Sequence, residues 1–375
     1  MSFVPLSQHR HRFEPGKPAP YSIFDVSGRL LLARGNVLES AEQLERLVDR
    51  EATIDPRELD DSARRIAGAR PEELPGFWED SIGAMSRLLR ANASGGADFT
   101  GALDRASKPL QALIERDPDL AILLAVRHDA SNPQAYASRH AVHTATSACV
   151  AAVRLGWSHE QVQCTLRVAL TMNIAMAELQ NKLAHQASPV TTLQRAEIRS
   201  HPERSAAMLE MAGVTDPNWL DAVRQHHEEE SGTGYPNGLT AVNDVAKLVH
   251  VADCFTAKLS PRLTRQPMLA DKAAREQYQR SPGDAMTAAL IKEFGLYPPG
   301  CAVRLKSGEL GMVIRRGESA STPVVAVLID RNGDALLTPA RRLTSKPEFT
   351  IVAVMPVSAL KVRIGLEKLM VHAWD

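Results

Sequence analysis

The long central part of the chain, from about residue 118 to 290, carries one helical pattern after another. Apolar residues recur there at the spacing of amphipathic helices, with almost none of the alternation typical of strands. Short β-rich runs lie only towards the two ends, around 21–38 and after 300. This distribution predicts a mainly α fold, in which an all-helical domain is flanked by a small N-terminal α+β domain and a small C-terminal β domain.

Changes of pattern predict where these parts begin and end. We expect an N-terminal domain at 1–70, a helical connector at 71–117, the helical domain at 118–295 and the β domain at 296–375. The run YSIFDVSGRLLLARGNVL (21–38) predicts a hairpin around a Ser-Gly turn, and Ser40 is a candidate N-cap for the helix that follows. Pro109 predicts a kink or break in the connector, and the chain ends in a segment of uncertain structure.

Composition excludes several classes of function. Lys+Arg and Asp+Glu both number 44, so there is no net charge to attract nucleic acid or an anionic membrane. The four cysteines form no Cys-x-x-Cys pair, which argues against a zinc knuckle or a disulfide scaffold. The N-terminus lacks the apolar segment of a signal peptide, and LAILLAV at 120–126 is too short to span a bilayer. The sequence therefore predicts a cytoplasmic protein with reduced thiols.

Three places in the helical region offer candidate metal ligands. His140 lies in the alanine-rich YASRHAVHTATSACVAA, and His201 precedes Pro202, which suits the first turn of a helix. Asp253 is a lone carboxylate in the apolar AKLVHVADCFTAKL, a costly position unless it is paired or binds a metal. For each histidine alone, a buried and hydrogen-bonded core residue is the commoner outcome.

The fourth place is HHEEESGTGYPNGL, residues 226–239. Adjacent residues on a helix diverge by about 100°, so His226 and His227 are not expected to face one ligand equally well. The Gly-Thr-Gly-Tyr-Pro that follows predicts a turn with two glycines and a rigid proline. Such a loop allows the backbone to approach a bound ligand closely.

These residues together resemble the HD-GYP domains, a branch of the HD phosphohydrolase superfamily. The family signature is similar to H-H-E-x-x-D-G-x-G-Y-P, and this chain has HHEEESGTGYP in the same order after Tyr-x-x-x-His and His-Pro. The resemblance covers about 118–290 and implies an all-helical HD-type domain of bacterial signalling that hydrolyses cyclic di-GMP with bound metal. The metal ligands that it implies are His140, His201, His226, His227 and Asp253. The substrate-binding residues that it implies are Gly234, Tyr235, Pro236, Arg262 and Arg265.

The chain departs from the family at its most characteristic position. Where the family has a His-Asp pair within a pattern like L-H-D-I-G-K, this chain has LTMNIAM, so that Met172 and Asn173 replace the pair. The signature aspartate has become Ser231. The dipeptide His128-Asp129 lies ahead of His140 instead of about thirty residues after it, and we interpret it as part of a loop.

The replacements remove the residue that bridges two ions in the family mechanism. A neutral amide such as Asn173 is a poor bridge between two dications, and the thioether of Met172 is mismatched to hard ions. The remaining imidazoles and carboxylate suit one divalent ion, Fe, Mn or Zn. The alternative that the chain binds no metal also stays open. The sequence therefore predicts no catalytic residues at the position of the pair.

Three functions remain open at this point. The first is a degenerate HD-GYP protein that binds a cyclic dinucleotide, such as cyclic di-GMP, or a signalling protein partner, with hydrolysis lost or strongly reduced. The second is a residual metal-dependent phosphodiesterase acting on cyclic di-GMP. The third is a structural interaction protein, whose histidines are core residues. The sequence allows a homodimer but does not indicate one.

Overall fold

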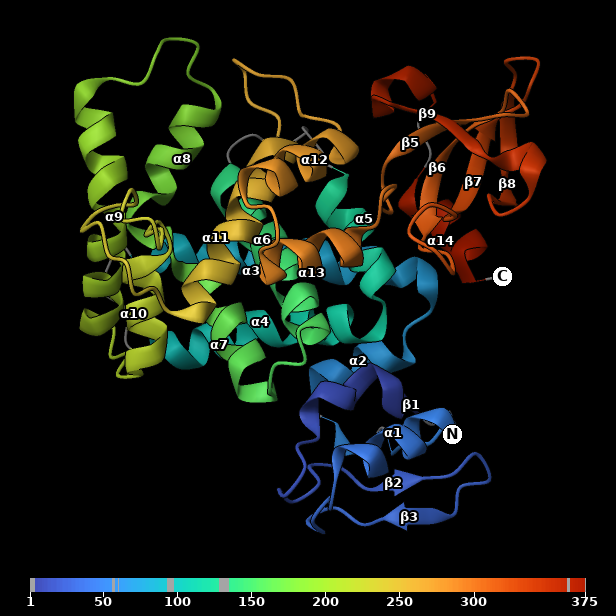
Figure 1. Ribbon diagram of the computed structural model, residues 1–375, viewed down its shortest axis with the longest axis horizontal. Helices are drawn as coiled ribbons and strands as arrows, with labels where there is room; N and C mark the ends of the chain where they lie inside the picture. Colours follow the sequence, from blue (N-terminus) through green and yellow to red (C-terminus); the bar gives the residue numbers. More distant parts are fainter. Residues whose placement is uncertain are drawn as a thin grey trace.

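The computed structural model describes residues 4–55, 58–59, 61–92, 98–127, 135–362 and 365–374. The dipeptide His128-Asp129 lies outside this range. Across the described residues, every helix is either too short or too polar to pass through a bilayer. The predicted fold class is confirmed, because helices dominate the chain and two small antiparallel sheets lie near its ends (Figure 1).

The N-terminal part is a small antiparallel sheet with one helix. Its strand order is β1-β4-β2-β3, and β2 and β3 form the predicted hairpin. Ser40 caps α1 as expected, because its side chain accepts a hydrogen bond from the amide of Gln43. The elements are β1 (Val4–Pro5), η1 (Leu6–Arg12), β2 (Ile23–Phe24), β3 (Leu30–Leu32), α1 (Ala41–Asp49) and β4 (Thr53–Ile54).

The next helices lead from this sheet to the centre of the molecule; the first precedes the predicted connector at 71–117 and the others lie within it. They are α2 (Asp61–Gly68), η3 (Pro71–Glu73), α3 (Leu74–Asn92) and α4 (Phe99–Arg116). The break predicted at Pro109 is wrong, because α4 continues through it. Leu110 and Leu113, in the helical turn after Pro109, are both buried. Their packing compensates for the hydrogen bond that proline cannot make. Trp78 of α3 stacks on His143, which is thus one histidine with a core role.

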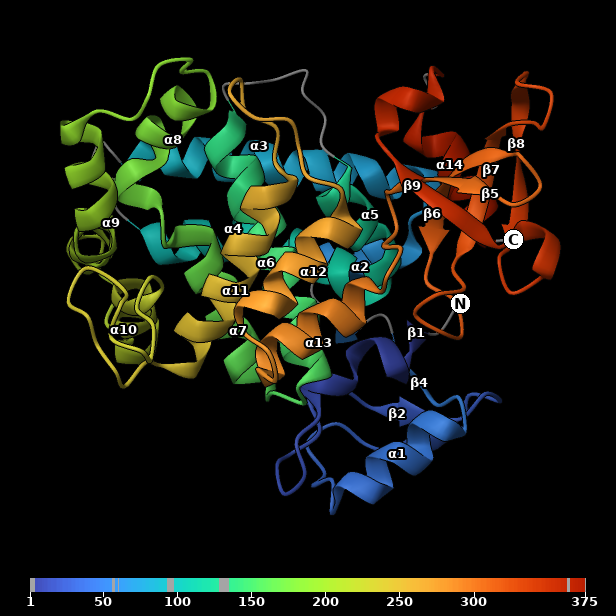
Figure 2. The same cartoon turned by 45° about the horizontal axis from the view of Figure 1, so that its top comes forward.

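The helical centre is built around α6. This helix contacts α5, α7, α11 and α13, and most of its residues are buried. In both views α8, α9 and α10 lie on the side away from the C-terminal sheet (Figures 1 and 2). The elements are α5 (Pro118–Val126), α6 (Tyr136–Arg154), α7 (His159–Thr171), η5 (Ile174–Met176), α8 (Ala177–Ala184), α9 (Thr192–Met211), α10 (Pro217–Gln225), α11 (Asp244–Leu259), α12 (Ala270–Arg280) and α13 (Ala285–Phe294).

The C-terminal part is a five-stranded antiparallel sheet with the order β8-β7-β6-β5-β9. The final segment, which the sequence left undefined, forms a helix that packs on this sheet and on η3. Two ion pairs join this sheet to the start of α5. Arg315, at the end of β6, pairs with Asp117, and Arg316, just after β6, pairs with Asp119. The elements are β5 (Ala302–Leu305), β6 (Leu310–Arg315), β7 (Val324–Ile329), β8 (Ala335–Leu343), η6 (Pro347–Phe349), β9 (Ile351–Met355), η7 (Val357–Leu360) and α14 (Leu366–Trp374).

A candidate metal centre of three histidines

His201 lies in the middle of α9, and its ring is oriented by a proline. The prediction that Pro202 stands in the first helical turn is wrong, because α9 runs from Thr192 to Met211. Proline has no N–H, so residue 202 cannot donate to the carbonyl of Ile198, its usual partner in a helix. Nδ1 of His201 takes that place at 2.5 Å from the Ile198 oxygen. The His-Pro dipeptide thus holds the imidazole with Nε2 pointing away from its own helix.

His226 and His227 lie just beyond the end of α10 and not within it. The helix ends at Gln225 and His226 is its C-cap. The divergence of about 100° expected for neighbours on a helix therefore does not apply, and this prediction is wrong. Nδ1 of His226 is 2.7 Å from the carbonyl oxygen of Val223, one of the carbonyls that a helix end leaves without an amide donor.

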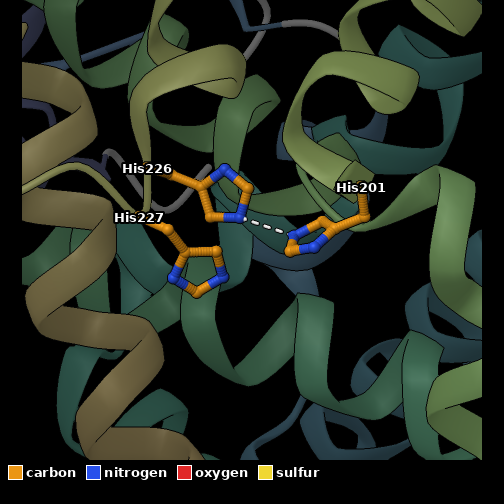
Figure 3. A group of neighbouring side chains, drawn as sticks. All are labelled: His201, His226 and His227. Atoms are coloured by element: carbon orange, nitrogen blue, oxygen red, sulfur yellow. Dashed lines mark hydrogen bonds between the residues drawn. The ribbon is translucent and has the colours of Figure 1, made fainter. Parts of the chain in front are cut away.

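The three imidazoles form one compact group, which we call the histidine group (Figure 3). One nitrogen from each of His201, His226 and His227 lies within 4.8 Å of the other two. Nε2 of His201 is 3.0 Å from Nε2 of His226. In each of these two rings Nδ1 donates its proton to a carbonyl, so in the neutral form Nε2 carries only a lone pair. The two nitrogens are at hydrogen-bonding distance (dashed line in Figure 3), but with these tautomers neither has a proton to donate, so two lone pairs face each other.

A cation bound between the two nitrogens would resolve this contact, and the donor set fits one. Imidazole nitrogens bind Zn²⁺ at about 2.0–2.1 Å, so two ligands of one tetrahedral ion lie about 3.3 Å apart. The observed 3.0 Å is close to that separation. The carbonyls of Ile198 and Val223 act on the outer nitrogens, which is the usual way in which proteins fix the tautomer of metal-binding histidines. Three neutral imidazoles suit zinc or iron.

Burial keeps the histidine group uncharged. It lowers the pKa of His201 to about 4 and the pKa of His227 to about 3. The pKa of His226 is also well below its ordinary value, first because of burial and then because of the neighbouring imidazoles. All three rings are therefore neutral at pH 7 and offer lone pairs to an electrophile.

His140 and Asp253 form a separate pair beside this group. Nε2 of His140, on α6, is 2.6 Å from Oδ1 of Asp253, on α11. Burial is the largest influence on Asp253 and opposes its ionisation, but the hydrogen bond from His140 and the attraction of His140, His227 and His226 together outweigh it and lower the pKa of the carboxyl below its ordinary value. The two residues stay outside the compact group, although the charge of Asp253 acts on His227. The five ligands implied by the family thus divide into three and two.

The 228–239 loop covers the histidine group on one side. The buried carboxylate of Glu228 accepts hydrogen bonds from the amides of Asn237 and Leu239, at 2.7 and 2.9 Å, and so ties the two ends of the loop together. Gly234 lies against the backbone of 227–229, where a Cβ would come within 2.4 Å of an amide nitrogen. Residue 234 must therefore be glycine, first of all, because the loop packs closely on its own backbone there.

Tyr235 lies directly on the histidine group. Its ring stacks on His227 with centroids 4.5 Å apart, and its edge faces His201. The peptide bond to Pro236 is cis. The GYP residues predicted to bind substrate therefore shape the wall of the site through Gly234 and present one aromatic ring, that of Tyr235, beside the histidines.

The two arginines predicted to hold phosphates lie after α11. Arg262 and Arg265 are exposed and joined by a tight backbone turn. Nε of Arg262 donates to the hydroxyl of Tyr136 at 3.0 Å, and the ring of Tyr136 stacks on His140. Arg265 donates to the carbonyl of Ala257. Arg262 is therefore linked by direct contacts to the His140–Asp253 pair.

The segment with Met172 and Asn173 packs against α9 close to His201. The amide of Ala175 donates to Ser205 at 3.3 Å, one turn beyond His201. Met172 is fully buried and Asn173 is half-buried, and neither side chain forms a hydrogen bond within the described part of the chain. Ser231, at the position of the signature aspartate, is exposed, and among the described residues its side chain bonds only to Thr233.

Sequence reasoning missed two residues that belong to the site. Tyr136 was noted only as part of the Tyr-x-x-x-His pattern, yet it connects Arg262 with His140. His250 lies one turn before Asp253 and Cys254 on α11, donates from Nδ1 to the carbonyl of His226, and faces the ring of His227. The spacing of these three residues on one helical face was the signal that could have found it.

Comparison with known proteins shows which proteins the region around these histidines is similar to. Residues 125–280 match the family model described as an HD domain, which includes every histidine of the site. This part of the chain is therefore similar in sequence to HD domains. The chain is 26% identical over 316 residues to the cyclic di-GMP phosphodiesterase PA4108 of Pseudomonas aeruginosa, covering 71% of this chain and 76% of that protein.

A search of solved structures found Bd1817, an HDG"Y"P protein from Bdellovibrio bacteriovorus. The match has a TM-score of 0.46 and 16% identity, and covers 75% of this chain and 96% of the other. The resemblance to the HD-GYP branch, first given by the motif at 226–236, is confirmed by the family match and the sequence relative.

Proposed function

We propose that this protein binds cyclic di-GMP at the histidine group, with one divalent ion held there, and that hydrolysis is lost or strongly reduced. The observation that carries the proposal is the pair of facing Nε2 lone pairs on His201 and His226, 3.0 Å apart in a neutral and buried group. His227 is the third ligand, and His140 and Asp253 stand beside it. Fe, Mn and Zn are the candidate ions.

The loss of hydrolysis follows from what stands at 172 and 173. A divalent ion in such a site supplies charge stabilisation and an acidic water to phosphodiester hydrolysis. Asn173 is neutral and cannot provide the anionic bridge for a second ion, and Met172 offers no hard ligand. Loss of one electrostatic stabiliser typically costs about a hundredfold or more in rate. Binding does not depend on that bridge, because the exposed arginines and Tyr235 remain in place.

Metal content tests the first half of the proposal. The full chain, purified without chelator, is expected to carry about one ion per chain. His201→Gln and His226→Gln should each lose it, because each removes a lone pair from the group. His185→Gln is the matched control, since His185 is exposed and its ring bonds, within the part of the chain that the structure describes, only to the carbonyl of Asn181. If the parent protein carries no metal as purified and takes up none when metal is added, the ion has no place in the proposal.

Calorimetry and turnover test the second half. The metal-loaded parent should bind cyclic di-GMP and turn it over very slowly in the presence of Mn²⁺ or Fe²⁺. Restoring Met172→His together with Asn173→Asp should raise turnover by about a hundredfold or more. A parent as active as the double variant would show that hydrolysis never depended on residues 172 and 173.

The second candidate function is a residual phosphodiesterase with one metal ion. It is favoured by the retained set of three imidazoles and by the relative named as a cyclic di-GMP phosphodiesterase. The same turnover assay separates the two functions. Metal-dependent hydrolysis in the parent that His226→Gln abolishes would favour the enzyme over the binding protein.

A further inference from the structure

Two aromatic rings stack on histidines of the site, and each carries an arginine. Tyr136 lies on His140 with centroids 5.9 Å apart and planes 13° apart, and the guanidinium of Arg262 lies 5.5 Å from the Tyr136 centroid. We call each such stack of histidine, tyrosine and arginine an arm, and the second arm has the same order. Tyr235 lies on His227 at 4.5 Å and 21°, and the guanidinium of Arg199 lies 5.4 Å from the Tyr235 centroid. The sequence drew no attention to Arg199.

The two arms come from different parts of the chain. Arg262 follows α11 and reaches a ring at the start of α6. Arg199 lies on α9, two residues before His201, and reaches a ring in the 228–239 loop. A tyrosine ring positions an arginine by cation–π attraction while leaving its N–H groups free for an anion.

The positive charge of these arginines is not neutralised by neighbouring acids. Within the described residues, no carboxylate forms an ion pair with Arg199, Arg262 or Arg265, and all three are exposed. Other arginines close by behave differently: Arg224 pairs with acidic residues on α9 and α10, and Arg204 pairs with Glu197. Unpaired guanidinium groups at the rim of one site favour an anionic ligand and suit phosphate in particular.

We infer that Arg199, supported by Tyr235, is a second phosphate-binding residue, so that the site recognises a ligand with two separate phosphate groups. The inference rests on the proposed function and sharpens it. Arg262 and Arg265 share one turn and bind one phosphate, and Arg199 on α9 binds the other. A cyclic dinucleotide satisfies both arms, whereas a mononucleotide satisfies one.

The test compares two ligands by calorimetry on the metal-loaded full chain. Arg199→Gln should weaken binding of cyclic di-GMP by about tenfold or more, the usual loss for one charged hydrogen-bond partner. It should weaken binding of guanosine 5′-monophosphate by about twofold at most, because the arm with Arg262 remains available. Arg195→Gln is the matched control: it removes the same charge from an exposed residue one turn earlier on α9, which has no cation–π contact with either ring in the described part of the chain.

Substitution of the supporting ring gives an independent readout. Tyr235→Leu should reproduce the selective loss of cyclic di-GMP affinity, and Tyr235→Phe should restore it because the ring is kept. If Arg199→Gln and Arg195→Gln lose equal affinity for cyclic di-GMP, only the overall positive charge of the surface matters, and the inference is overturned. An Arg199→Gln protein that binds cyclic di-GMP like the parent would overturn it and leave the proposed function intact. A parent that binds neither nucleotide would overturn both.

Discussion

We expect Pro202→Ala to lower the metal affinity of the site and to raise the stability of the metal-free fold. In the parent, the Ile198 carbonyl has no amide donor at residue 202 and accepts Nδ1–H of His201 at 2.5 Å. Alanine restores an N–H that competes for the same oxygen, so the ring of His201 is held less firmly in the tautomer with Nε2 free. Removing such an outer hydrogen bond typically lowers metal affinity by about 10–100-fold.

The same substitution should stabilise the metal-free helix. Proline inside a helix costs about 3 kcal/mol relative to alanine, and part of this is offset by lost packing because Pro202 is buried. We expect the free energy of unfolding of chelator-treated protein to rise by about 1 kcal/mol or more. Urea unfolding measures the stability, and competition with a chelating dye at pH 7.5 measures the affinity.

The control is Ser200→Ala, which also raises helix propensity on α9 but does not involve the Ile198 carbonyl. It should leave metal affinity unchanged. The reasoning is refuted if Pro202→Ala binds metal as tightly as the parent while His201→Gln binds none, because the Ile198 contact would then have no part in orienting the ligand.

Two further predictions follow from the buried group and the loop. Burial gives His201 a folded pKa of about 4 against an ordinary 6.5, so as pH falls below 6.5 the unfolded chain takes up a proton that the folded chain does not. The free energy of unfolding of metal-free protein should therefore fall from pH 6.5 towards pH 4, by up to about 1.4 kcal/mol per pH unit for each such histidine. His201→Asn should make this slope shallower in urea unfolding at stepped pH, and an unchanged slope would contradict the assigned burial. Gly234→Ala places a Cβ 2.4 Å from the amide nitrogen of Glu229 and should destabilise by about 1–3 kcal/mol. Gly76→Ala, with nothing within 4 Å, is its control, and equal melting temperatures for the two variants would count against the packing account.

Local signals in the sequence were sufficient for the hairpin and the helix start near the N-terminus. The hairpin at 21–38 and the Ser40 cap depend on turn residues and on contacts within a few positions, and both are present. Failures occurred where distant packing decides. Pro109 and Pro202 each stand inside a long helix because burial compensates for the missing hydrogen bond, and no local pattern reports burial.

The candidate site was predictable as a set of residues but not as an arrangement. The order of the motifs indicated His201, His226 and His227, and these three do meet. Their relation depends on where α10 ends, since one more helical turn would have directed His226 and His227 apart. The pairing of His140 with Asp253 joins residues 113 positions apart in the chain, and spacing along the sequence carries no information about it.

The construction of the site explains how the histidine group persists without the His-Asp pair. His201 and His226 are oriented by the carbonyls of Ile198 and Val223, which belong to their own helices. The segment with Met172 and Asn173 meets α9 through backbone atoms, the amide and carbonyl of Ala175. None of these hydrogen bonds uses the side chain of residue 172 or 173. On the function proposed above, a substitution that removes the bridge between two ions would leave the three imidazoles that hold one ion, so that binding would outlast catalysis on the same fold.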